Sequence, residues 1–160
     1  MRYPASTVAL ALCLAAAGAQ AGGVVNVTFV EPDKFYDSGN SEFDKPANLK
    51  TIETFLQYLG QRHLPDGQVL DIEVLNVDLA GYIRLTRPGE LRIVRGGADW
   101  PNFQLRYKLS AGGQTLRQGE ERVADLSYTN KIASYSTREP LHYEKQMLDG
   151  WFRERFAAPL

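Results

Sequence analysis

The spacing of hydrophobic residues changes period several times along this chain. In residues 25–29 and 103–109, apolar and polar residues alternate, which is the period of a half-buried β-strand. Residues 70–79 alternate as well, but their apolar set shifts phase at Leu75. Because a strand can shift phase only through a bulge, a bend or burial of both faces, we expect a long, central strand with one irregularity.

Glycine-rich segments separate the later strands. Residues 111–114 read Ala-Gly-Gly-Gln, a hairpin turn signal, and the returning stretch 115–123 is polar, as an edge strand should be. Glycines and prolines in residues 81–101 surround one more short strand candidate at 91–94. The Ser-, Thr- and Tyr-rich stretch 125–139 is expected to connect the last strand to a C-terminal helix.

Two segments have the helical period instead. In residues 46–63 one arc holds Leu49, Ile52, Phe55, Leu56, Leu59 and His63. In residues 140–156 one broad side holds Leu141, Met147, Leu148, Trp151, Phe152 and Phe156. Each apolar stripe must be buried against another surface, and the strands are the available partners.

These elements predict a single α+β domain over residues 22–160. We expect a two-layer sandwich in which a mixed or largely antiparallel sheet of four or five strands carries both helices on one face. The helix 46–63 lies between the strands 25–29 and 70–79 in the sequence, so these two strands are expected to run parallel through a crossover.

The first 21 residues have the pattern of a cleaved signal peptide. Arg2 precedes a short apolar run at 8–17, and Ala19-Gln20-Ala21 offers small residues for cleavage. We expect export to the periplasm with cleavage after Ala21, the alternative being an uncleaved anchor. The run is shorter than the roughly 20 residues that span a bilayer, so no transmembrane helix is expected in the mature chain.

Composition narrows the chemistry that the mature chain can perform. Without the signal segment, 17 basic and 19 acidic residues leave a net charge of −2, which gives no reason to expect nucleic acid as a partner. The only cysteine, Cys13, lies in the signal segment, so disulfides and thiolate chemistry leave with it. Phosphate-binding glycine loops, G-x-S-x-G elbows and H-E-x-x-H helices are absent from the sequence, and no cofactor or metal is expected.

Acidic residues offer two weak sites. Asp71, Glu73 and Asp78 lie on or beside one predicted strand and, with His63, could form an acid and base pair; otherwise they are the solvent side of that strand. The loop after the first strand holds Asp33, Asp37, Glu42 and Asp44, but their spacing does not match a calcium-binding loop.

Residues 81–101 offer the best candidate for a binding surface. This glycine-rich segment concentrates positive charge and aromatic rings, and such loops commonly contact ligands and partners. The candidate binding residues are Tyr82, Arg84, Arg87, Arg92, Arg95 and Trp100. The alternative is a solvated hairpin whose Trp100 covers the core.

Four segments together resemble the domain-of-unknown-function family 3016. They read VTFVEPDKF, LDIEVLNVDLAG, WPNFQLRYKL and EPLHYEKQMLDGWF, and DLAG and YEKQMLDGWF are the most specific of them. The resemblance implies a small secreted protein of a Gram-negative bacterium and brings no assigned catalytic or binding residue.

Three functions remain open from the sequence. The first is a non-enzymatic periplasmic binding or envelope-accessory module, whose partner is an envelope protein or a small ligand bound by residues 81–101. The second is a hydrolase-type enzyme built from His63 and the scattered carboxylates. The third is an assembly module that pairs through the polar edge strand 115–123.

Overall fold

A four-stranded sheet is the platform of the fold. The computed structural model describes residues 22–87, 89–130, 132 and 134–157 of the chain, so the predicted signal segment lies outside the described residues. The strands are β1 (Val24–Phe29), β2 (Gln68–Asp78), β5 (Asn102–Ala111) and β6 (Gln114–Ala124), in the spatial order β1-β2-β5-β6. β1 and β2 run parallel and the other pairs antiparallel, which confirms the expected mixed sheet with β6 at its edge.

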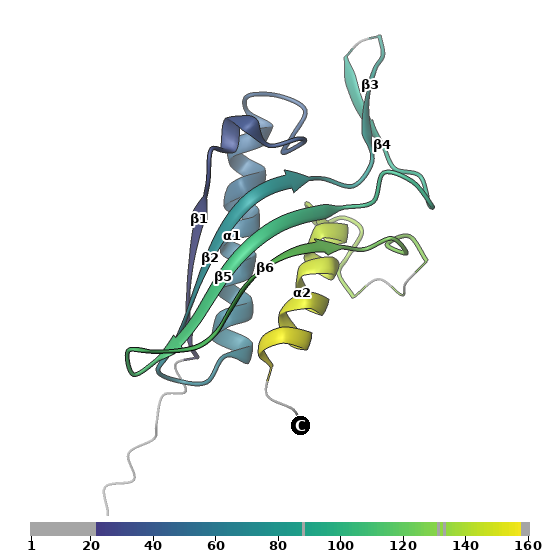
Figure 1. The fold of residues 1–160 in the computed structure, drawn as a ribbon. Helices are drawn as coiled ribbons and strands as arrows, with labels where there is room; N and C mark the ends of the chain where they lie inside the picture. The colour runs from purple at the N-terminus through teal and green to yellow at the C-terminus, as the bar shows by residue number, and fades with distance from the viewer. Residues whose placement is uncertain (1–21, 88, 131, 133, 158–160) are drawn as a thin grey trace, which may run out of the picture.

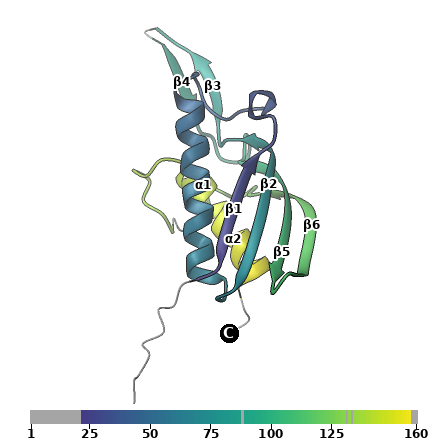
Figure 2. The same cartoon turned by 90° about the vertical axis from the view of Figure 1, so that its left-hand side faces the viewer.

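Two helices cover one face of this sheet (Figures 1 and 2). They are α1 (Asp44–His63) and α2 (His142–Phe156), each beginning two residues from its predicted start. Leu56 and Leu59 of α1 and Phe152 of α2 are fully buried in one core with the inner residues of the strands. The predicted α+β sandwich is therefore confirmed.

The irregularity expected in β2 lies where the hydrophobic pattern shifts. The pairing of β2 with β5 changes register between Val74 and Asn76. Before this point the buried residues of β2 are Leu70, Ile72 and Val74, and after it they are Val77 and, directly beyond the strand, Leu79. The bulge thus keeps the same face of the strand in the core although the apolar residues change phase.

A second sheet of two strands projects from one end of the molecule. β3 (Tyr82–Leu85) and β4 (Glu90–Ile93) pair antiparallel and extend beyond the body (Figure 1). We call these two strands the arm. The sequence predicted a strand at 91–94 but missed β3, because its residues alternate over only four positions and are mostly exposed.

Candidate functional site

The base of the arm joins segments that are far apart in the sequence. Ala80 follows β2, and its backbone N–H donates a 2.7 Å hydrogen bond to Oε1 of Glu144, in the first turn of α2. These two residues belong to DLAG and YEKQMLDGWF, the two most specific segments of the family resemblance. Glu144 is only 3% exposed, and this burial raises the pKa of its carboxyl group.

Arg92 of β4 is bound to the other side of the same peptide segment. Its Nη1 donates to the carbonyl oxygen of Ala80 at 3.2 Å. Its two terminal nitrogens also donate to the two carboxylate oxygens of Asp37, at 2.9 and 2.8 Å, and Nη2 donates to Asn40. A guanidinium that binds a carboxylate through two parallel hydrogen bonds is held in a fixed orientation. We call Asp37, Ala80, Arg92 and Glu144 the arm support.

Asp37 reaches this position because its loop pairs with the end of β2. The Asp37 N–H donates to the Val77 carbonyl, and the Leu79 N–H donates back to the Asp37 carbonyl. Asp37 and Asp78 form an isolated parallel bridge there. The polar loop is consequently held in place beside the base of the arm.

A cavity of about 510 Å³ lies between this loop and the base of the arm. Tyr36 and Tyr82 contribute aromatic rings to its lining, and Asp78 and Asp99 contribute carboxylates. Burial raises the pKa of Asp78, while a 2.7 Å hydrogen bond from Asn102 opposes that shift.

The predicted binding residues divide into two groups around the arm. The Arg95 guanidinium lies 4.6 Å from the centre of the Tyr82 ring and 3.5 Å from Asp99. Tyr82 and Arg95 therefore lie with Arg92 at the base of the arm. Arg84 and Arg87 are exposed farther out, where neither forms an ion pair within the described residues. Trp100 is half-buried in the connection to β5.

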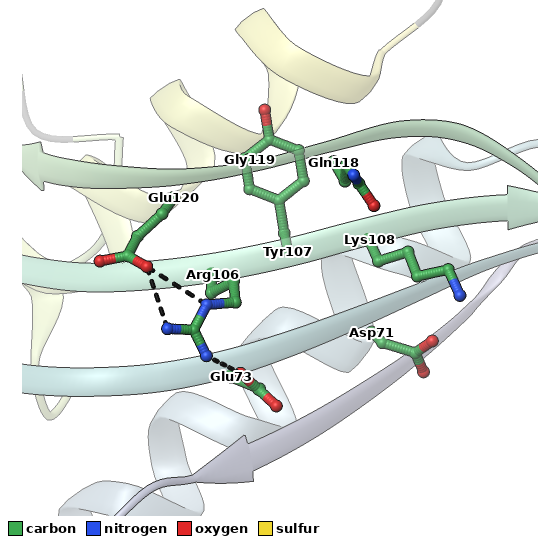
Figure 3. A pocket seen from close by; sticks show the side chains of 8 residues that line it. All are labelled: Asp71, Glu73, Arg106, Tyr107, Lys108, Gln118, Gly119 and Glu120. Carbon is green, nitrogen blue, oxygen red and sulfur yellow. Dashed lines mark hydrogen bonds and ion pairs between the residues drawn. The ribbon is translucent and has the colours of Figure 1, made fainter.

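Asp71 and Glu73 lie on the opposite, helix-free face of the sheet. Glu73 accepts a 2.7 Å hydrogen bond from Arg106, which also contacts Glu120 at 3.0 Å (Figure 3). These carboxylates raise the pKa of Arg106. Asp71 accepts a hydrogen bond from Asn26. This face therefore carries a ladder of satisfied charges beside a shallow hollow of about 530 Å³.

The structure does not bring His63 to the three predicted acids. His63 ends α1 on the helix side, where its Nε2 lies 3.8 Å from Oδ1 of Asp149. Burial lowers the pKa of His63. Asp71 and Glu73 point to the other face, and Asp78 ends the eleven-residue β2, whose start follows His63. Because a strand rises about 3.3 Å per residue, Asp78 lies a full strand length away from the end of the sheet where His63 is.

Within the described residues, no three His, Asp or Glu side chains are grouped so that they could hold a metal ion. In the described part of the chain, neither α1 nor α2 is long and apolar enough to cross a bilayer.

The model of the family described as "Protein of unknown function (DUF3016)" matches residues 23–154, which include the arm and all four residues of the arm support. No curated protein and no solved structure matches the chain.

Proposed function

The chain belongs to the family described as protein of unknown function (DUF3016), and from this premise we propose that it is a non-enzymatic binding or accessory protein of the cell envelope. Its binding element is the arm, and its partner is an envelope protein or a small ligand held at the base of the arm. The signal-peptide pattern of residues 1–21 supports export, with the mature chain beginning at Gly22.

The exposed apolar side chains of the arm carry this proposal. Leu85 is 80% exposed and Leu91 is 52% exposed, although each lies in a strand. They lie on opposite faces of the hairpin, because Leu85 is paired with Glu90 and Leu91 with Arg84. Arg84 and Arg87 lie beside them with no ion pair within the described residues. Apolar side chains bordered by unpaired arginines are typical of surfaces that bind partners, because binding removes the apolar area from water.

The arm support favours a binding role because it holds the arm in a fixed position. A two-stranded hairpin is only marginally stable in water by itself. Here the bidentate pair between Arg92 and Asp37 fixes the base of the arm to the body, so its exposed side chains are presented in one orientation.

Photo-crosslinking in living cells tests the proposal. A photoreactive amino acid at position 91 should give a specific covalent adduct in the envelope fraction. The matched control is position 116 in β6, because Leu116 is 53% exposed but lies far from the arm. An adduct from 116 as abundant as that from 91, or none from 91, would contradict binding by the arm.

Export is tested on the same cells. The mass of the protein recovered from the periplasm should correspond to 139 residues, the 160 of the full chain minus the first 21. A full-length protein retained with the cytoplasm would contradict this part of the proposal.

A further inference from the structure

The sequence of β4 indicates which partner the arm binds. Resting on the proposed function of the arm, we propose that β4 pairs antiparallel with β4 of a second copy of this chain. The two arms then form one four-stranded sheet, β3-β4-β4-β3, with Leu91 on the two-fold axis. Three or more strands are needed for an independently stable sheet, which the isolated arm does not reach.

The charges of β4 select this register. In antiparallel pairing about Leu91, the two Leu91 side chains are opposite each other, and Glu90 of each copy is opposite Arg92 of the other. Centring the pair on Glu90 or Arg92 would instead place like charges opposite each other. Pairing through β3 offers no such contact, because its only charged residue is Arg84.

Glu90 and Arg92 can each form a further polar contact. Glu90 has no ion pair within the described residues. Arg92 uses Nη1 and Nη2 in the arm support, and its Nε has no hydrogen bond in the described structure. The second copy therefore completes the polar contacts of β4 while it covers Leu91.

The edge strand β6 of the main sheet is less suited to self-pairing. The charged side chains of β6 already have partners inside the chain: Glu120 binds Arg106, and Glu121 accepts hydrogen bonds from Trp151 and Arg155. Arg117 donates to the carbonyl of Arg155. A partner at β6 would have to compete with these contacts.

The projection of the arm makes the pairing sterically accessible. The arm extends beyond the helices and the main sheet, so two arms can lie antiparallel while the two bodies remain at opposite ends (Figure 1). A two-fold axis through Leu91 gives an isologous, closed dimer rather than a fibre. Since each paired strand has only four residues, the dimer should be concentration-dependent.

Disulfide trapping tests this register. The full chain is used with Cys13→Ser, so that one added thiol is the only one. Residues opposite each other in antiparallel strands have Cα atoms about 4.5–5.5 Å apart, within the range of a disulfide. Leu91→Cys should oxidise to a covalent dimer, whereas Leu85→Cys should remain monomeric although Leu85 is more exposed. Adding Glu90→Arg to Leu91→Cys should slow dimer formation roughly tenfold, because two attractive pairs become repulsive.

Each outcome decides between the two proposals. If Leu91→Cys does not form a dimer faster than Leu85→Cys, or if Glu90→Arg leaves its rate unchanged, self-pairing through β4 is overturned. If self-pairing fails while the photoreactive residue at position 91 captures a different protein, the proposed function stands with another partner. If neither the added cysteine nor the photoreactive residue at position 91 yields an adduct, both proposals fail.

Discussion

Glu144 and Ala80 lie 64 residues apart in the sequence and are joined by a 2.7 Å hydrogen bond in the interior of the protein. Because the carbonyl of Ala80 also accepts a hydrogen bond from Arg92, this peptide connects the start of α2 to the base of the arm. The two segments that best mark the family therefore meet at one structural junction, and we expect substitutions there to affect both stability and the arm.

Removing the buried acceptor at this junction should destabilise the fold. Glu144→Ala leaves the buried Ala80 N–H without its partner, which costs about 1–3 kcal/mol in the free energy of unfolding. Denaturant unfolding followed by circular dichroism measures this loss. Glu154→Ala is the matched control, because Glu154 is an exposed glutamate of the same helix and should change stability little. Equal effects of the two substitutions would contradict a special role for Glu144.

The stability contributed by Glu144 should depend on pH. Burial raises the pKa of this carboxyl group in the folded state, and Arg92 and Asp37 are the charged groups that act on it, in opposite directions. The folded state therefore favours the protonated form. Its contribution is fully present below the unfolded pKa of about 4.3 and is lost as the pH rises through the higher folded pKa.

Glu144→Gln tests this dependence. Its side-chain oxygen can still accept from Ala80, but the group does not ionise. The difference in unfolding free energy, wild type minus variant, should fall as the pH is raised above about 4.3. Unfolding curves at a series of pH values measure it. A difference that stays constant with pH, or rises, would show that Glu144 does not titrate in this way.

Loss of the Arg92 anchor should loosen the arm without unfolding the body. Arg92→Ala removes the bidentate pair with Asp37 and the contact with Ala80, so the amides of β3 and β4 should exchange with deuterium faster than in the wild type. The amides of β2 and β5 should keep their protection. Arg84→Ala, which removes an exposed arginine from the same arm, serves as the control. Uniformly faster exchange over the whole chain would indicate global destabilisation instead.

Hydrophobic periodicity predicted the elements that face the core. The phase shift at Leu75 located the bulge in β2, and the apolar side of residues 140–156 matched the buried Trp151, Phe152 and Phe156. These predictions succeed because burial is repeated every second residue in strands and at helical spacing in helices.

The arm support could not be predicted in the same way. Asp37 lies in a polar loop with no period, and its partner Arg92 is 55 residues farther along the chain. Arg92 was a candidate binding residue in the sequence, yet its guanidinium has a structural role at the base of the arm. The signal that could have pointed to Glu144 is its place in a segment typical of the family, since its own position in α2 resembles that of any helical glutamate.

Two glycines in helices should respond in opposite directions to the same substitution. Gly60 of α1 packs so closely against β1 that an added Cβ would lie 2.3 Å from Cγ2 of Val25. Gly60→Ala should therefore cost about 1–3 kcal/mol through overpacking. Gly150 of α2 has no atom within 4 Å of an added Cβ, so Gly150→Ala should stabilise the fold by about 1 kcal/mol through helix propensity.

Val25→Ala separates overpacking from other causes of the Gly60 effect. Val25 is buried, so its truncation alone should also destabilise the fold. In the double variant the new methyl at position 60 occupies space that the valine has vacated. The loss in the double variant should therefore be smaller than the sum of the two single losses. A double-mutant cycle of unfolding free energies should give a coupling above about 0.5 kcal/mol. Strict additivity would mean that the contact between α1 and β1 at Gly60 is not the origin of the loss.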